Sequence, residues 1–265
     1  MEASTRPLAL VTGASSGIGL ELAKQFASNG FDLVIAAEDA ELAQAVDALQ
    51  GFGGQVHAVQ VDLATPEGVE ELHARATALG RPLDAAALNA GVGLGGPFVE
   101  NDLERELEIV DLNVRSLVHL AKHVVRAMVA RGQGRLLITS SIASTMPGTF
   151  HAVYNASKSF DQSFALALRQ ELKDTGVTVT TLMPGPTDTE FFDRGELTDT
   201  RMGATDMKDD PADVARQGFE GLMEGKERVE ASSLTTKIQG RVSRLIPDSL
   251  KAAAHSKMAE PGSGG

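Results

Sequence analysis

Three polar side chains near the middle of the chain have types and spacing suited to proton transfer. Tyr154, the only tyrosine among 265 residues, lies four positions before Lys158 and thirteen after Ser141. On a helix, residues four apart share a face, so the Lys158 ammonium would stabilise the Tyr154 phenolate and lower the phenol pKa from about 10. Such a phenol can exchange a proton with a carbonyl or alcohol oxygen that Ser141 also contacts. By itself, Tyr-x-x-x-Lys also describes a surface pair on an amphipathic helix.

A glycine-rich segment near the N-terminus could bind a phosphate group. Residues 12–19 read TGASSGIG and join an apolar run to a helical pattern. Gly13, Gly17 and Gly19 would therefore place backbone N–H groups and the positive end of a helix dipole where a pyrophosphate can bind. The spacing differs from Gly-x-Gly-x-x-Gly, and a purely structural strand-to-helix turn is the alternative interpretation.

Two carboxylates follow the second apolar run, about 20 residues beyond these glycines. Glu38 could accept hydrogen bonds from a ribose 2′-hydroxyl. Asp39 is better suited to capping the helix expected to begin near Ala40. The sequence thus predicts a ribose contact from one acid and a structural role for its neighbour.

The elements that must position these residues are short apolar runs alternating with longer helical patterns. Continuous apolar runs predict parallel strands covered by helices on both faces, and ligands bind at the carboxyl ends of such strands. We predict a doubly wound α/β, Rossmann-type fold with a parallel sheet of about seven strands. The expected strands are 8–12, 32–37, 56–62, 84–89, 135–140, 177–183 and 228–232, and expected helices include 18–28, 66–79, 103–131 and 153–174.

A chain of this length with 42% hydrophobic residues is expected to form one core. Residues 1–233 are predicted to form a single dinucleotide-binding domain that includes the catalytic residues and a substrate loop at 186–210. Residues 234–259 are predicted to be a helical extension of it, and 260–265, which read EPGSGG, a disordered tail.

Composition excludes several classes of function. The net charge of −12 argues against nucleic acid as a partner, and the absence of cysteine excludes disulfides, thiolate metal sites and a cysteine nucleophile. No segment has the length of a signal peptide's apolar region or of a membrane span, so we expect a cytoplasmic protein.

The histidines are not assigned to the chemistry. His119 and His123 have the spacing of a metal site on a helix, but no third ligand is identified, so we predict no metal. His151, three residues before Tyr154, is expected to face solvent or to cap a helix.

Six motifs in order show that the chain resembles the short-chain dehydrogenase/reductase family. They are TGASSGIG at 12–19, NAG at 89–91, Asn113 in DLNVRSL, Ser141, YNASK at 154–158 and PGPTDT at 184–189. The resemblance runs from about Leu8 to Ser232. It implies an NAD(P)-dependent oxidoreductase that interconverts a ketone or aldehyde and an alcohol.

The resemblance also implies roles for four residues. Tyr154 would be the general acid/base, Ser141 would polarise the substrate oxygen, and Lys158 would tune the tyrosine and bind the nicotinamide ribose. Asn113 would position a water that links this lysine to solvent. A cap or a kink in its own helix is the structural alternative for Asn113.

Cofactor contacts follow from the same resemblance. The implied set is Gly13, Ser15, Ser16, Gly17, Ile18, Gly19, Glu38, Asp62, Leu63, Asn89, Ala90, Gly91, Tyr154, Lys158, Pro184, Gly185, Thr187 and Thr189. Asn89 could also hold neighbouring loops together, and we expect its structural and cofactor roles to coexist. Basic residues that commonly mark a 2′-phosphate site in this family are missing from the turn, and Glu38 would repel a phosphate, so NAD is preferred to NADP.

The expected substrate is a mainly apolar small molecule, because the segments that the resemblance places around the pocket carry Phe98, Met146, Phe150, Phe191 and Phe192. One alternative is reduction of a 3-oxoacyl thioester on a carrier protein, with the basic segment 234–258 as its docking site. A second, of another class, is a non-catalytic dinucleotide-binding regulator or scaffold. Helices 103–131 and 153–174 are apolar on more than one face, which suggests a homodimer or homotetramer, although internal packing has the same pattern.

Overall fold

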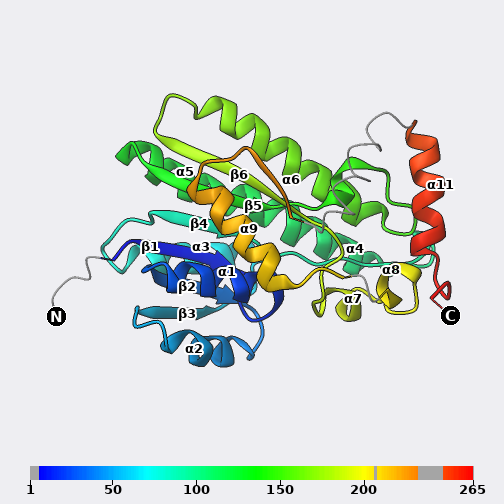
Figure 1. Cartoon of the computed structure of the whole chain (residues 1–265), viewed down its shortest axis with the longest axis horizontal. Coiled ribbons are helices and arrows are strands. Elements are labelled where there is room, and N and C mark those ends of the chain that lie inside the picture. The colour runs from blue at the N-terminus through cyan, green and yellow to red at the C-terminus, as the bar shows by residue number, and fades with distance from the viewer. Residues whose placement is uncertain (1–5, 206–207, 232–246, 265) are drawn as a thin grey trace.

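The computed structural model describes residues 6–205, 208–231 and 247–264. Its centre is a parallel sheet of seven strands in the order β3-β2-β1-β4-β5-β6-β7 (Figure 1). The strands are β1 (Leu8–Thr12), β2 (Asp32–Ala37), β3 (Val56–Gln60), β4 (Ala85–Leu88), β5 (Gly134–Thr139), β6 (Val177–Pro184) and β7 (Arg228–Ala231). The predicted Rossmann-type fold is confirmed, and each predicted strand is present with ends within two residues.

Helices cover both faces of the sheet (Figure 1) because neighbouring strand residues point to opposite sides. One core contains Ala9 and Val11 of β1 with the apolar faces of α1 (Gly17–Ser28), α2 (Leu42–Gln50) and α9 (Pro211–Met223). The other contains Leu8 and Leu10 with α3 (Pro66–Thr77), α5 (Leu117–Arg131) and α6 (Ala152–Glu171). This two-sided burial explains why the strands are apolar without alternation.

The long helix expected at 103–131 contains a π-helical segment. It comprises α4 (Leu103–Ile109), η1 (Val110–Ser116) with π-helical geometry, and α5. Asn113 lies in the middle of η1 and is buried. The predicted single helix is thus continuous but locally widened, and such segments are frequent at functional sites.

Two short helices and the C-terminal helix gather at one end of the sheet (Figure 1). Loop 186–210 contains α7 (Phe191–Arg194) and α8 (Arg201–Ala204), and a bridge between Thr187 and Asp209 closes its base. The C-terminal helix α11 (Asp248–Ala259) packs beside α8. These elements build one wall of the cavity described below.

The C-terminal tail differs from expectation. Residues 260–264 form a turn in which the Gly262 N–H donates to the Asp199 carboxylate (2.9 Å) and the Gly264 N–H to the Asp199 carbonyl (2.8 Å). In this structure, backbone hydrogen bonds to loop 186–210 therefore hold the tail that was predicted to be disordered. Most of the basic segment, including Lys237, Arg241 and Arg244, lies outside the described residues.

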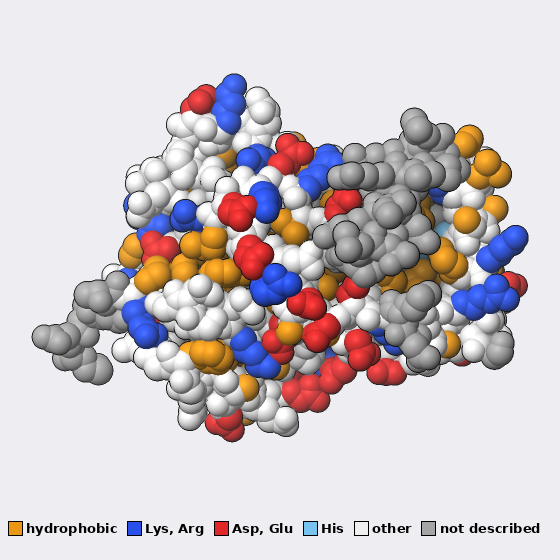
Figure 2. Space-filling model, viewed as in Figure 1, with side chains coloured by type: hydrophobic (Ala, Val, Ile, Leu, Met, Phe, Trp, Pro, Cys, Tyr) orange, Lys and Arg blue, Asp and Glu red, His pale blue; other side chains and the backbone are white. Residues whose placement is uncertain are grey.

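Acidic side chains are prominent on the face shown in Figure 2, as the net charge of −12 requires. Within the described part of the chain, no helix is both long enough and apolar enough to cross a membrane.

Candidate active site

A cavity of about 940 Å³ lies at the carboxyl ends of the strands. One end is formed by the glycine turn and the residues after β2 and β3. The other is formed by the residues after β5, by loop 186–210 and by α11. Every residue in the predicted catalytic and cofactor sets lines this cavity except Asn113, which lies behind its wall. The fold thus brings the distant motifs of the sequence together.

The glycine turn needs glycine because of its backbone conformation and because the chain packs closely against it. Gly13 and Gly17 have φ of +63° and +52°, which side chains other than glycine rarely adopt. A Cβ at Gly19 would lie 1.8 Å from the Gly13 carbonyl oxygen. Ser16, the N-cap of α1, makes no capping hydrogen bond, so the first-turn N–H groups are left for a ligand. These residues fit a dinucleotide's pyrophosphate.

Asn89 has the expected structural role. Its Nδ2 donates to the Thr12 carbonyl (3.3 Å), and its Oδ1 accepts from the Thr139 hydroxyl (3.0 Å). The Thr12 hydroxyl accepts from the backbone N–H groups of Asn89 and Ala90 at 2.9 and 3.0 Å. These bonds tie together the ends of β1, β4 and β5, which form the cavity floor.

The end of the cavity beyond β2 is acidic. Partial burial raises the pKa of Glu38, and the nearby carboxylates, chiefly that of Asp62, raise it further. Asp39 does not cap a helix as predicted, because α2 begins at Leu42 and the Asp39 carboxylate accepts from the Ser15 hydroxyl at 2.9 Å. The turn and the acids after β2 are thus linked directly.

Arg194 is a cavity residue that the sequence analysis missed. It comes from α7, yet its guanidinium lies 3.5 Å from Asp39, 3.3 Å from Glu41 and 2.7 Å from Glu190. Only tertiary structure brings this arginine, some 155 positions away, to the acids after β2. It joins the substrate loop to the acidic end of the cavity.

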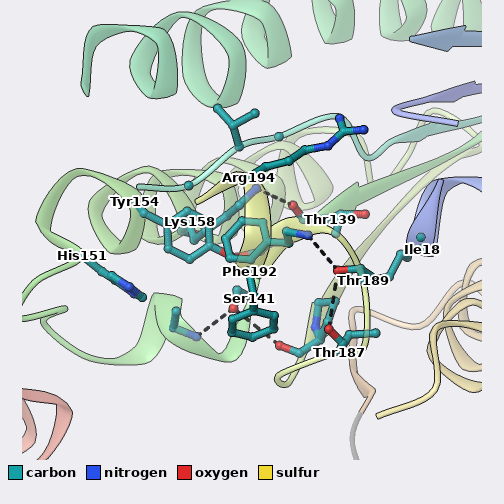
Figure 3. A pocket seen from close by; sticks show the side chains of 18 of the residues that line it. Ile18, Thr139, Ser141, His151, Tyr154, Lys158, Thr187, Thr189, Phe192 and Arg194 are labelled. Atoms are coloured by element: carbon teal, nitrogen blue, oxygen red, sulfur yellow. Dashed lines mark hydrogen bonds between the residues drawn. The ribbon is translucent and has the colours of Figure 1, made fainter. Parts of the chain in front are cut away.

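The proton-transfer residues converge as predicted. Figure 3 shows Tyr154 and Lys158 of α6 side by side, near Ser141 at the end of β5. The Ser141 hydroxyl accepts from the Ala143 N–H at 3.1 Å. By contrast, the Ser140 hydroxyl is buried and donates to the Lys158 carbonyl at 2.7 Å. Of the two serines, Ser141 is therefore the one available to a substrate.

Lys158 is buried and has a carboxylate partner that the sequence analysis missed. Its Nζ donates to Asp161 Oδ2 at 3.0 Å and to the Thr139 carbonyl at 3.1 Å. Burial lowers the pKa of Lys158, but the charge of Asp161, the nearby Tyr154 and the hydrogen bond to Asp161 together outweigh this effect and raise it. Burial also raises the pKa of Asp161, because Lys158 offsets only part of the cost of removing that charge from water. The lysine is therefore held as an ammonium.

The pKa of Tyr154 is shifted in the direction opposite to that predicted. Removal of the phenol from water raises the pKa, and Asp161 raises it too. Lys158 and a hydrogen bond with Ser141 lower it, but by less. The predicted lowering by Lys158 is present but is outweighed by burial, which helical spacing alone does not reveal. The raised pKa keeps the Tyr154 phenol protonated at neutral pH.

Asn113 joins the cavity wall to α6. Its amide exchanges two hydrogen bonds with the backbone of Val92, each 2.9 Å long, and donates a third to the Ser157 hydroxyl at 3.0 Å. A Cβ at Gly91 would lie 3.1 Å from Asn113 Oδ1 and 3.2 Å from Lys158 Nζ. The backbone of Gly91 thus lies close to both the Asn113 amide and the Lys158 ammonium, and no side chain would fit between them.

Comparison with known proteins agrees with this geometry. Residues 7–199 match the family model described as short chain dehydrogenase. The chain belongs to the short-chain dehydrogenase family. It is 38% identical to a 1-deoxy-11-beta-hydroxypentalenate dehydrogenase of Streptomyces exfoliatus over 75% of this chain and 76% of that protein. It is 37% identical to a granaticin polyketide synthase putative ketoacyl reductase of Streptomyces violaceoruber, over 72% and 71%.

A solved structure supports the same assignment. A short-chain dehydrogenase from Sphingobium yanoikuyae in complex with NADPH superposes with a TM-score of 0.80 at 26% identity, covering 96% of each chain. The family predicted from the six motifs is confirmed, and with it an oxidoreductase acting on CH–OH groups.

The apolar part of this dehydrogenase's cavity only partly matches the predicted pocket. Met146, Phe191 and Phe192 line it, and the Phe191 ring packs 5.1 Å from that of Tyr154. Phe98 and Phe150 do not line it, so their assignment is corrected. Phe98 is 60% exposed, and Phe150 has φ of +64°. Whether a loop residue faces the cavity or the outside depends on the backbone turns of the loop. These turns cannot be predicted from the hydrophobicity of the residue.

The dehydrogenase's C-terminal helix completes this region. Leu250, His255 and Met258 of α11 line the cavity. His255 Nδ1 lies 2.9 Å from the Thr149 carbonyl, which secures α11 to the segment before α6. The helical extension predicted for the C-terminal segment is thus present in α11, which packs over the cavity.

His151 lies at the N-cap position of α6, as one of its two expected roles requires, but its side chain makes no capping hydrogen bond and lines the cavity instead of facing solvent. It is 3% exposed, and its ring lies 6.2 Å from that of Tyr154 and 5.4 Å from that of His255. Burial and the charge of His255 lower its pKa to about 4. Among the described residues its Nε2 has no hydrogen-bond partner, so this neutral nitrogen is available to a polar group in the cavity.

Acid should destabilise the dehydrogenase through His151. The unfolded chain binds a proton there near pH 6.5, and the folded protein does so only near pH 4. As the pH falls through this window the unfolded state therefore gains the proton first. The contribution of neutral His151 to the free energy of unfolding is fully present above pH 6.5, and up to about 3 kcal/mol of it is lost as the pH falls through this window. Urea unfolding at the two ends of the window measures this loss.

His151→Gln should reduce that loss, and His255→Gln should reduce it in part by removing the second cause of the shift. An acid-induced loss of equal size in the unaltered protein and in His151→Gln would contradict this account.

Proposed function

We propose that this dehydrogenase interconverts a ketone or aldehyde and an alcohol on a mainly apolar small molecule, with NAD(H) as the preferred cofactor. The observation that carries the proposal is the placement of the Tyr154 phenol between Ser141 and Lys158, in one cavity with the glycine turn (Figure 3). A purely non-catalytic scaffold has no need of a buried lysine with its own carboxylate partner.

In the proposed mechanism a substrate oxygen lies between the Ser141 hydroxyl and the Tyr154 phenol. Ser141 donates a hydrogen bond that orients and polarises the carbonyl, and Tyr154 delivers the proton in reduction or removes it in oxidation. The Lys158 ammonium, fixed by Asp161 and the Thr139 carbonyl, stabilises the phenolate left after proton delivery. The nicotinamide, when bound, supplies or accepts the hydride. Asn113 holds the Val92 segment against α6 and so preserves this arrangement.

The apolar side chains in the cavity support a hydrophobic substrate. Met146, Phe191, Leu250 and Met258 line the end that also contains Tyr154. His151 is the polar group placed to orient a second oxygen of such a molecule.

A screen of ketones, aldehydes and alcohols tests the function. Reduction or oxidation is followed by the absorbance of NADH or NADPH, with Tyr154→Phe run in parallel. The proposal expects turnover of hydrophobic carbonyls that depends on Tyr154. Cofactor binding without turnover of any compound in a broad panel would contradict it.

A second candidate is reduction of a 3-oxoacyl thioester, favoured by the similarity to the Streptomyces violaceoruber protein, whose name includes ketoacyl reductase. Comparing a 3-oxoacyl thioester on a carrier protein with the same acyl group on a short thiol distinguishes the candidates. Preference for the carrier-bound form that disappears at high salt would favour the second.

The preference for NAD rests on the acids after β2. Glu38→Arg should raise the ratio of kcat/KM for NADPH to that for NADH by about 10-fold or more, because it removes a repelling charge and adds a donor to a 2′-phosphate. Initial rates with the two cofactors measure the ratio. Asp47→Arg on α2, outside the cavity, makes the same charge change and should leave the ratio unchanged. An unaltered ratio in Glu38→Arg would remove the assigned role.

We also propose the expected homodimer or homotetramer. In its support, apolar side chains of the predicted helices remain exposed, namely Val110 (41%), Val118 (38%) and Phe160 (39%). Light scattering of the purified protein gives the number of subunits, and a monomer at micromolar concentration would contradict the proposed oligomer.

We also propose the expected cytoplasmic location, which cell fractionation tests.

A further inference from the structure

A cluster of histidines and one glutamate lies between α3 and α5, outside the cavity. Glu70 Oε1 is 2.7 Å from His119 Nε2 and 3.0 Å from His123 Nε2. No metal was predicted from the sequence, because no third ligand could be identified beside His119 and His123. The packing of α3 on α5 now brings a candidate third ligand, Glu70, from 49 positions away.

The three side chains are positioned to converge on one point. His119 and His123 are four apart on α5 and therefore project from one face. The ligand atoms of all three residues lie within 4.8 Å of one another. The ring of His73, one turn after Glu70 on α3, stacks on that of His123 at 4.0 Å between centroids. This contact limits the orientations open to His123.

The cluster is half-buried, so its rings are held yet an ion can reach them. The side chains of His119 and His123 are 29% and 27% exposed, and that of Glu70 is 55% exposed. None of the three lines the cavity that holds Tyr154. A ligand here would therefore occupy a separate site.

We propose that Glu70, His119 and His123 form a zinc-binding site that joins α3 to α5. Two imidazole nitrogens and one carboxylate oxygen are ligands that Zn²⁺ accepts at about 2.0–2.2 Å, with a water completing four-coordination. Tetrahedral ligands at such bond lengths are about 3.3 Å apart, so the carboxylate needs to withdraw by well under 1 Å from its present hydrogen bonds. Mg²⁺ and Ca²⁺ prefer all-oxygen sites and are disfavoured by the two nitrogens.

An ion at this site would bind the folded protein in preference to the unfolded chain, because the two helices are far apart in sequence. Zn²⁺ at 100 times its dissociation constant should therefore raise Tm, by about 5 °C for a chain of this length. The site would thus fasten two helices that cover the same face of the sheet.

Calorimetric titration and thermal unfolding test the proposal, with Zn²⁺ as the probe and Mg²⁺ as the comparison. The sample is the full chain without a histidine tag, and it is treated with chelator beforehand. One Zn²⁺ should bind per chain and raise Tm, whereas Mg²⁺ should do neither. Glu70→Gln, His119→Ala and His123→Ala should each weaken Zn²⁺ binding by at least about 10-fold. Co²⁺ should give the visible absorption of a four- or five-coordinate ion, and His123→Ala should remove it.

Glu71→Gln is the matched control, since Glu71 neighbours Glu70 on α3 but pairs with Arg75 instead. It should bind Zn²⁺ as the unaltered protein does. Zn²⁺ binding that survives both histidine substitutions, or that is lost instead in His255→Gln, would place the ion elsewhere and overturn the proposal. So would equal weakening by Glu70→Gln and Glu71→Gln.

Discussion

Tyr154→Phe should lower kcat for carbonyl reduction by about 1,000-fold while cofactor affinity stays within a few-fold of the unaltered enzyme. The substitution removes the proton donor but keeps the ring that packs 5.1 Å from Phe191. Positioned general acids contribute about 10²–10⁴-fold to rate, which sets the expected size. Steady-state rates and titration of NADH fluorescence on binding measure the two quantities separately.

A variant that retained most of its turnover would show that another group delivers the proton. His151 is then a candidate, since it lines the same cavity and its ring lies 6.2 Å from that of Tyr154. Combining Tyr154→Phe with His151→Gln would test this, because loss of the remaining turnover would identify the histidine.

Asp161→Asn should destabilise the fold by about 3–5 kcal/mol. Lys158 and Asp161 have side chains only 6% and 2% exposed, and the substitution leaves a buried ammonium without its charged partner. Urea unfolding measures the change, and the midpoint should fall well below that of the unaltered protein. Turnover should fall as well, since the lysine loses the contact that fixes its position.

Two comparisons make the Asp161 result specific. Asp213→Asn breaks an ion pair with Arg216 in which the two side chains are 65% and 48% exposed, and it should cost less than about 1 kcal/mol. The double variant Lys158→Met, Asp161→Leu removes both buried charges and should be more stable than Asp161→Asn, although inactive. Equal costs for the buried and exposed pairs would contradict the assigned role of burial.

The sheet and the proton-transfer group could be predicted because their signals are local. Continuous apolar runs report strands buried on two faces, and the four-residue spacing from Tyr154 to Lys158 reports a shared helical face. Asp161 could have been found in the same way, since it lies one turn after Lys158. The raised pKa of Tyr154 could not, because it depends on burial by segments distant in sequence.

Residues that meet through packing left no such signal. Arg194 reaches Asp39 only because loop 186–210 folds over the cavity, and Glu70 reaches His119 only because α3 packs on α5. Phe98 and Phe150 show the converse, since hydrophobicity placed them in a pocket from which the turns of their loops exclude them. Motif and periodicity therefore predict elements and their order better than they predict which loop side chains share a cavity.

The π-helical η1 segment sets the rotational phase of α5 relative to α4. An i→i+5 helix turns less per residue than the about 100° of an α-helix, so if residues 110–116 adopted α-helical geometry at unchanged length, α5 would turn relative to α4. Leu120 and Val124 would then leave the core, and His119 and His123 would leave Glu70. Losing one residue while the segment became α-helical would largely restore the phase, so the wide geometry and the number of residues in this segment are constrained together.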